Sequence, residues 1–320
     1  MDEEMREAGE DTSWRKAIPE ARDRLQSAVL VGVVGLVLIL ETFTVLRQVS
    51  ILWGEQNVRE HFLLAEIVGV SVAFAALVVS LRAATTAGAL FGGMICFLLI
   101  DGTASSQSTI ARSGLAPLAL LFVLTFLATK AGRRVKARAG LAEKRHGRSS
   151  AQVIANLSIA GLAVSALGIE LATGSGVCCG TPDYRVWVSP VTMLMCLAAM
   201  VEATADTVSS EIGQAFGGRP VMLLTLHRVD PGTDGAVTLL GSLAGIAGGV
   251  LVAALGMWAL RLRPSQAALA LFAGVCGLFF DSFLGATVER RGWIGNDLVN
   301  FASTVFAAAL AALIYRFFFL

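Results

Sequence analysis

Long apolar segments alternate with short polar ones along almost the whole chain. Nine such segments can be distinguished, at residues 25–46, 62–81, 84–100, 114–129, 151–172, 189–205, 236–260, 265–284 and 300–320. Most of them approach the ~20 residues that cross a bilayer as an α-helix. Inside a bilayer every backbone polar group needs an internal partner, and a helix supplies one. The pattern therefore predicts an all-α, polytopic membrane helix bundle with about nine transmembrane helices.

Composition supports the membrane class and indicates how the chain is divided. Of the 320 residues, 55% are hydrophobic and only 15% are charged. The mean hydropathy is +0.71, which is more apolar than a single soluble core requires. Residues 1–26 are the exception, because they are polar and mixed in charge. We expect a cytoplasmic polar arm over 1–26 and one transmembrane catalytic domain over 27–320, with a basic cytoplasmic loop at 130–148.

The basic residues predict the orientation of the bundle. Lysine and arginine collect in cytoplasmic loops, and the loop 130–148 contains eight of them. With nine spans the amino terminus is then cytoplasmic, and the two sides carry 18 and 7 Lys or Arg. We expect an integral protein of the cell (inner) membrane, with the active site facing the cytoplasm. No feature indicates nucleic-acid binding, because topology and anionic lipid explain the basic loop.

Carboxylates interrupt the apolar pattern near residue 205. Glu202, Asp206 and Ser210 fall at i, i+4 and i+8, on one face of a helix, and Glu211 follows them. A charge near the centre of a membrane helix costs roughly 2.5 to 3.5 kcal/mol unless it is paired or hydrated. One explanation is that Asp206 and a neighbouring residue bind Mg²⁺, with Ser209, Ser210 or Thr207 assisting and triphosphate oxygens completing the octahedron. The alternatives are a buried polar cluster, a helix end hydrated at the interface or, for Glu202, a basic partner on another helix.

A second polar island begins at Asp281 and Ser282, where an apolar segment ends. Asn296 and Asn300 follow, one helical turn apart, before the last segment. If this island faces the same cavity as the first, Asp281 can share the metal ion with the carboxylates near residue 205. Taken alone, an aspartate and a serine at a helix end are an ordinary terminus.

A third island lies after the basic loop, where Arg148, Gln152 and Asn156 again fall at i, i+4 and i+8. A guanidinium and two amides on one helix face are suited to holding a phosphate. The alternative is amide-mediated helix packing, which contributes about 1 kcal/mol in membranes.

The run from residue 229 to 238 is rich in glycine but is not a P-loop, because GxxxxGK[ST] occurs nowhere in the chain. It predicts a turn whose backbone amides could hold phosphate at the start of the next helix. By contrast, Gly241, Gly245 and Gly249 form a GxxxGxxxG face, for which helix packing is the favoured role. The residues considered for nucleotide binding are Gly213, Arg219, Arg228, Gly232, Thr233, Asp234 and Gly235.

These motifs together resemble a known membrane family. The matching residues are 206–213, 216–217, 220, 232–237, 241–242 and 281–287, with 147–148, 152–153 and 155–156 matching the central motif. The family was first catalogued as of unknown function, and it includes the plant plastid phytyl-phosphate kinases and the animal transmembrane protein 19. More distantly, the pattern is similar to dolichol kinases, phytol kinases and phosphatidate cytidylyltransferases. The resemblance covers roughly residue 63 to the carboxyl terminus.

The resemblance implies an integral membrane kinase that converts an isoprenoid monophosphate, such as phytyl or geranylgeranyl phosphate, to the diphosphate with CTP or ATP. It implies Mg²⁺ at Asp206 and Asp281, with Glu202 and Glu211 beside them or as alternative ligands. The residues implied for the lipid phosphate are Arg148, Gln152, Asn156, Ser282, Asn296 and Asn300. Relatives usually differ at Val208-Ser209 and at Ser149, so the preference for substrate or nucleotide is expected to differ.

Two other functions fit the same residues. A lipid cytidylyltransferase uses the same nucleotide and metal but attaches CMP to the lipid phosphate, and a secondary transporter uses intramembrane carboxylates as ion sites. A transporter requires carboxylates near the bilayer midplane, whereas Asp206 and Asp281 are expected near the cytoplasmic ends of their helices. The expected partners are therefore the isoprenoid phosphate and membrane lipids. A homo-oligomer is compatible with the sequence but has no support in it.

Overall fold

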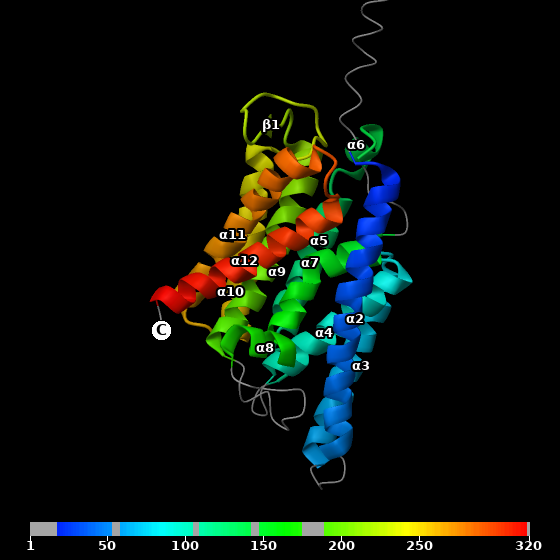
Figure 1. Cartoon of the computed structure of the whole chain (residues 1–320), viewed down its shortest axis with the longest axis vertical. Helices are drawn as coiled ribbons and strands as arrows, with labels where there is room; N and C mark the ends of the chain where they lie inside the picture. The colour runs from blue at the N-terminus through cyan, green and yellow to red at the C-terminus, as the bar shows by residue number, and fades with distance from the viewer. Residues whose placement is uncertain (1–17, 53–57, 105–108, 142–146, 175–188, 319–320) are drawn as a thin grey trace, which may run out of the picture.

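The computed structural model describes residues 18–52, 58–104, 109–141, 147–174 and 189–318, which form a bundle of α-helices (Figure 1). Most of the predicted arm 1–26 and part of the basic loop 130–148 lie outside the described residues. The helices are α2 (Glu20–Leu52), α3 (Val58–Ser80), α4 (Thr86–Thr103), α5 (Leu115–Lys130), α6 (Arg133–Arg138), α7 (Ser150–Ala163), α8 (Ala166–Thr173), α9 (Pro190–Phe216), α10 (Leu239–Ala259), α11 (Pro264–Leu284) and α12 (Asn296–Phe318).

The structure confirms the all-α polytopic bundle. Within the described residues, seven helices are long and apolar enough to cross a membrane, namely α2, α3, α4, α9, α10, α11 and α12. A bend of 66° separates α7 from α8, and this pair gives an eighth span if it is counted as one. The ninth expected segment is α5, an apolar helix of 16 residues, which at 1.5 Å per residue is about 24 Å long and shorter than a typical hydrocarbon core. Seven or eight spans thus replace the expected nine.

The helices alternate in direction, so their polar ends collect at one end of the bundle, which we call the site end. There the amide of Thr85, before α4, donates to the carbonyl of Arg148, before α7, at 2.9 Å. The end of α5 meets the end of α9, where Gly132 lies against Ala215. Figure 1 shows α6 and the β1 region at this same end. The site end therefore gathers helix ends that lie far apart in the sequence.

Helix α9 lies at the centre of the bundle and packs against α5, α7, α10, α11 and α12. It approaches α10 most closely through the predicted glycine face. A Cβ atom on Gly241 would lie 2.5 Å from the carbonyl oxygen of Ser209, and one on Gly245 would lie 2.4 Å from that of Ala205. Gly249 lies against Val201 one turn further on. The packing role predicted for this face is confirmed.

Local sequence signals define where the helices at the site begin. Ser149 and Gln152 form a capping box at the start of α7, and Thr238 caps α10 by accepting from the amide of Gly241 at 3.0 Å. At the opposite end of the bundle, Ser189 caps α9, which has proline at its first position. Each of these side chains satisfies an amide that a helix start leaves without a partner. Caps and proline thus fix the first residues of α7, α9 and α10.

The segment between α9 and α10 folds over the site end. Its two short strands, β1 (Val221–Met222) and β2 (Ala236–Val237), pair in antiparallel fashion. After α11 the chain continues as a π-helical turn, η3 (Gly285–Glu289). The predicted glycine-rich turn therefore lies between the end of β1 and the start of α10, next to η3.

Candidate active site

A polar cavity of about 410 Å³ opens at the site end and brings the three predicted polar islands together. The start of α7, the second half of α9, the end of α11, the start of α12 and the glycine-rich turn all contribute to its lining. The predicted site residues that line it are Arg148, Gln152, Asn156, Asp206, Ser210, Glu211, Gly213, Gly232, Thr233, Asp234, Gly235, Asp281, Ser282, Asn296 and Asn300. Residues far apart in sequence thus share one chamber.

The carboxylates of Asp206 and Asp281 face this cavity from α9 and α11. They lie close enough to repel each other, while the guanidinium of Arg148 attracts Asp206. The hydroxyl of Ser303, on α12, donates to Oδ2 of Asp281 at 3.3 Å. Excess negative charge in a partly buried cavity favours a bound cation, so the two aspartates are placed to hold one.

Glu202 lies one turn deeper on α9 and is 1% exposed. It does not line the cavity, but Asp206 and Ser303 are among the polar groups around its carboxylate. Within the described residues its Oε2 atom has no hydrogen-bond partner. Gly277 on α11 makes room for it, because a Cβ atom there would lie 2.6 Å from Cγ of Glu202. Glu202 therefore lies buried one helical turn below Asp206, outside the lining of the cavity. Within the described residues no basic side chain pairs with it.

The oxygen donors at this site fit Mg²⁺. In the described part of the chain, no three His, Cys, Asp or Glu side chains come together as a ready-made metal site. Mg²⁺ is usually bound through one or two carboxylates, with substrate phosphates and water completing the octahedron. Asp206 and Asp281 match that pattern, and Ser210, which is exposed at the cavity, adds a hydroxyl.

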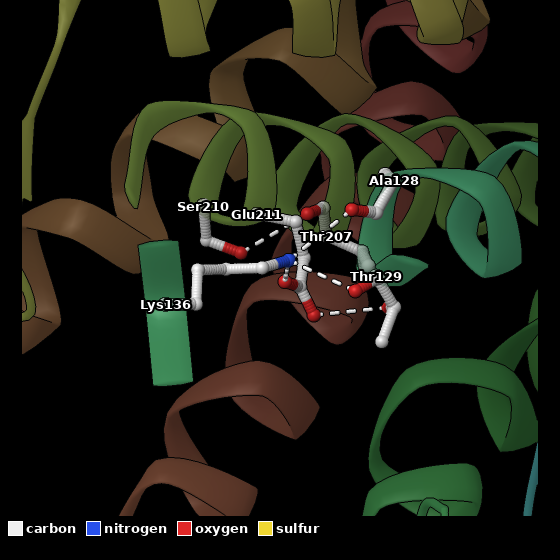
Figure 2. A network of polar contacts seen from close by, with 6 residues as sticks. All are labelled: Ala128, Thr129, Lys136, Thr207, Ser210 and Glu211. Atoms are coloured by element: carbon white, nitrogen blue, oxygen red, sulfur yellow. Dashed lines mark hydrogen bonds and ion pairs between the residues drawn. The ribbon is translucent and has the colours of Figure 1, made fainter. Parts of the chain in front are cut away.

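Glu211 takes part in a network of polar contacts with residues of α5 and α6 (Figure 2). Its Oε2 atom pairs with Nζ of Lys136, and its Oε1 accepts from the hydroxyl of Thr129 at 2.9 Å. Lys136 is 1% exposed and also donates to the carbonyls of Ala128 at 3.2 Å and Thr129 at 3.0 Å. Both carboxylate oxygens are therefore engaged in a network that ties α5 and α6 to α9.

Arg148 is held in place by the turn between α3 and α4. Its amide donates to the carbonyl of Ala83 at 3.0 Å. Gly147 has φ +72°, and a Cβ atom there would lie 2.5 Å from that same carbonyl oxygen, so only glycine fits without strain. In the next turn, the side chain of Gln152 accepts from the Ser149 amide at 2.8 Å, which leaves its NH₂ group for a ligand. Backbone contacts thus fix the position of Arg148 and Gln152 at the wall of the cavity.

The glycine-rich turn packs tightly against η3. Gly235 has φ +72°, and a Cβ atom there would lie 2.1 Å from the amide nitrogen of Ala286. The Thr233 amide already donates to the Asp230 carbonyl at 3.2 Å, so the remaining amides of the turn are the candidates for phosphate. Burial raises the pKa of Asp234 to about 6, and the guanidinium of Arg290 opposes this shift.

Two predicted nucleotide residues lie apart from the cavity. Arg219 and Arg228 are both exposed on the segment between α9 and α10, and neither lines the chamber. Their predicted role would require this segment to move toward a bound triphosphate.

Two site residues were not predicted. Glu289, at the end of η3, is 9% exposed and lines the cavity. The signal that could have found it is the spacing of Asp281, Gly285 and Glu289 at i, i+4 and i+8, which continues the helix face of the second island. The second, Lys136, does not line the cavity but pairs with Glu211, and nothing in the sequence distinguishes it from the other basic residues of its loop. π-Helical turns such as η3 are frequent at functional sites.

Comparison with known proteins places the chain in a family. Residues 69–308 match the model described as integral membrane protein DUF92, and this is well over half of the chain. The chain belongs to the DUF92 family. The matched range contains every residue that lines the polar cavity and begins after α2. The chamber is thus built entirely from the DUF92 part of the protein.

Three relatives set the level of similarity within DUF92. Protein VTE6, chloroplastic, from Arabidopsis thaliana is 29% identical over 208 residues, which are 64% of this chain and 59% of the relative. The uncharacterized membrane protein sll0875 from Synechocystis is 31% identical, over 62% of this chain and 72% of the relative. Protein PGR from Arabidopsis thaliana is 29% identical, over 58% and 68%. The match thus spans 59% of the length of VTE6. No solved structure gives a significant match.

Proposed function

We propose that this DUF92 protein is an isoprenoid-phosphate kinase of the membrane. It would transfer the γ-phosphoryl group of a nucleoside triphosphate, CTP or ATP, to a prenyl monophosphate such as phytyl or geranylgeranyl phosphate. The observation that carries the proposal is that two carboxylates, a fixed arginine and a glycine-rich turn meet in one polar cavity at the helix ends. The resemblance to the plastid phytyl-phosphate kinases supports the same assignment.

The orientation belongs to the same proposal. The exposed basic residues Lys130, Arg133 and Arg134 lie at or next to the site end, and basic residues concentrate on the cytoplasmic side of membrane proteins. A cytoplasmic site end, in the cell membrane, gives the cavity access to nucleotide. Membrane lipids would reach it between the helices.

In the proposed reaction the protein aligns two phosphates and offsets their charge. Asp206 and Asp281 would hold Mg²⁺, which when bound neutralises negative charge on the triphosphate. Arg148 and Asn156 would bind the lipid phosphate, and free amides of the turn 232–235 would bind the nucleotide. Ser282, Asn296 and Asn300 add neutral donors around the same space.

The chemical step needs no strong general base. An oxygen of the lipid phosphate is already anionic, and it forms the new bond to the γ-phosphorus. The bond from that phosphorus to the β,γ-bridging oxygen breaks, and the nucleoside diphosphate leaves with the electron pair. Phosphoryl transfer depends mainly on positioning and electrostatic stabilisation, which is what the fixed Arg148 and the paired aspartates supply.

The test is a product analysis with purified protein in nanodiscs. The protein is incubated with Mg²⁺, geranylgeranyl or phytyl phosphate and CTP, ATP, GTP or UTP separately, and lipid products are identified by mass spectrometry. The expected product is a prenyl diphosphate with the matching nucleoside diphosphate, abolished by Asp206→Asn. Asp230→Asn is the matched control, because Asp230 is an exposed carboxylate outside the cavity. A CMP-lipid with pyrophosphate would reassign the protein to the cytidylyltransferases, and no lipid product with any nucleotide would refute both.

A further inference from the structure

A second, smaller cavity adjoins the polar one. It encloses about 80 Å³ between α3, α5 and α7, and its wall consists mainly of apolar side chains. Phe74 and Val78 line it from α3, Leu121 and Phe122 from α5, and Leu157 from α7. We call this cavity the tail groove.

The two cavities share part of their walls. Arg148, Gln152 and Asn156 line both of them. One face of the α7 start therefore separates a polar chamber from an apolar groove. A ligand bound at Arg148 can present a polar group to one side and a hydrocarbon chain to the other.

The positively charged residues of the groove lie at one of its ends. Its cationic lining residues, Arg82, Lys130 and Arg148, all belong to the site end. From Lys130 the lining of α5 continues back to Leu118, which at 1.5 Å per residue is about 18 Å along the helix. A basic entrance followed by an apolar interior complements an anionic head group that carries a long tail.

One wall of the groove is formed by α3, a helix at the periphery of the bundle. Figure 1 shows α3 at the edge of the bundle, and it packs mainly against α4. An aromatic wall joins α3 to α5, because Phe74 meets Phe122 edge to face at 5.7 Å and Phe122 stacks on Phe126 at 5.8 Å. Whole drug-sized ligands occupy cavities of about 300–1,000 Å³. The enclosed volume thus holds the first part of a tail, and the remainder would extend between α3 and α5 into lipid.

We propose that the tail groove receives the hydrocarbon tail of a lipid phosphate whose phosphate lies at Arg148, and that the lipid enters sideways between α3 and α5. This inference rests on the proposed function, because that function supplies the lipid phosphate as the substrate class. It adds the route and the residues that contact the tail. Phe74, Phe122 and Leu121 are then the residues that determine which tails fit.

Photo-crosslinking tests the groove directly. Protein in nanodiscs is labelled with a geranylgeranyl phosphate analogue that carries a diazirine within its tail, with and without excess unlabelled geranylgeranyl phosphate. We expect the competed crosslinks to map to 74–83 and 115–130. Competed crosslinks on α10, α11 or α12, or labelling that the unlabelled lipid does not reduce, would overturn the proposal.

A matched pair of variants on α5 sharpens the test. Leu121→Trp fills the groove and should reduce competed crosslinking about tenfold or more, which corresponds to about 1.4 kcal/mol of binding. Val123→Trp adds the same side chain on the lipid-facing side of α5, where Val123 is exposed and outside the groove, and should leave crosslinking unchanged. Equal effects of the two variants would count against the groove.

A third variant covers the case in which Leu121→Trp fails to fold. Phe122→Ala enlarges the groove, so it should shift the preferred tail toward bulkier or longer chains in competition experiments. An unchanged tail preference in folded Phe122→Ala would contradict the proposal. These measurements distinguish the two proposals. Competed crosslinks on α3 and α5 without phosphoryl transfer would support the tail groove and refute the kinase function. Phosphoryl transfer with competed crosslinks on other helices would refute the tail groove alone.

Discussion

Replacing Lys136 with methionine would leave the Glu211 carboxylate without its cation inside the bundle. Lys136 is 1% exposed and Glu211 17% exposed at the side-chain level. The ammonium group of Lys136 also satisfies the carbonyls of Ala128 and Thr129. Methionine keeps the length and apolar character of the stem, so the change removes mainly the charge and its donors.

The magnitude follows from what remains around Glu211. Removing one partner of a buried ion pair generally destabilises a protein by about 3–5 kcal/mol. Glu211 is slightly exposed and keeps the hydrogen bond from Thr129, so we expect the lower end, about 3 kcal/mol. In the double variant Lys136→Met, Glu211→Gln no charge is stranded, and the loss should shrink to about 1 kcal/mol.

The assay is a double-mutant cycle on the unfolding free energy, measured by steric trapping in bicelles, with thermal unfolding as a parallel readout. Each single variant strands one charge of the pair, so the double variant should lose less stability than the sum of the two single losses, by at least about 2 kcal/mol. Additive effects of the two single substitutions would refute the reasoning. The same variants decide the role of Glu211 in the reaction: a folded double variant that has lost phosphoryl transfer would assign Glu211 a catalytic role, and an active one would assign it a purely structural role.

Three further predictions follow from the site. Gly235→Ala should destabilise the protein by more than Gly218→Ala, because both positions have positive φ but Gly218 has open space around it; thermal unfolding of the two variants compares them, and equal losses would contradict the tight contact. The pKa of Asp234 is raised to about 6 in the folded protein, from an ordinary value of 3.8. Protonated Asp234 therefore contributes to the stability of the fold fully below pH 3.8, and this contribution is lost as the pH rises through about 6. Asp234→Asn should accordingly gain stability relative to the natural chain between pH 5 and pH 7, on the order of 1 kcal/mol or more, and a constant difference would refute the shift. Arg148→Lys should lower kcat/KM for the lipid phosphate about 10- to 100-fold through lost bidentate contacts, whereas Arg134→Lys, on the exposed α6, should leave it unchanged.

The bend between α7 and α8 is a feature that the pattern of apolar residues did not predict. Residues 151–172 form one continuous apolar segment in the sequence, yet the chain breaks there by 66°. Ser165 caps a new helix by accepting from the Gly168 amide at 3.5 Å, and Gly168 lies against the carbonyl of Leu162. A serine inside an apolar run starts a helix only when the neighbouring elements favour the bend, and the sequence does not show those neighbours.

For the charged residues, the sequence predicted which of them lie at polar positions but not which groups they contact. Helical spacing predicted polar faces that contain Asp206 and Arg148, and Asp281 was predicted from its place at the end of an apolar segment; all three line one cavity. Spacing could not indicate that Glu211 pairs with Lys136, or that Arg219 does not line the cavity. The face of a helix is a local property of the sequence, whereas the partner of that face depends on how the helices pack.

The sequence by itself determined the membrane class, the positions of the helices and the glycine face that joins α9 to α10. Apolar length, capping residues and small-residue spacing act within one segment, so each can be read without its neighbours. The tertiary structure alone decided that three polar islands form one chamber, that Glu289 enters it and that an apolar groove adjoins it at Arg148. These features depend on contacts between helices more than 50 residues apart, for example Arg148 with Asp206, and no local pattern specifies which helix ends will meet.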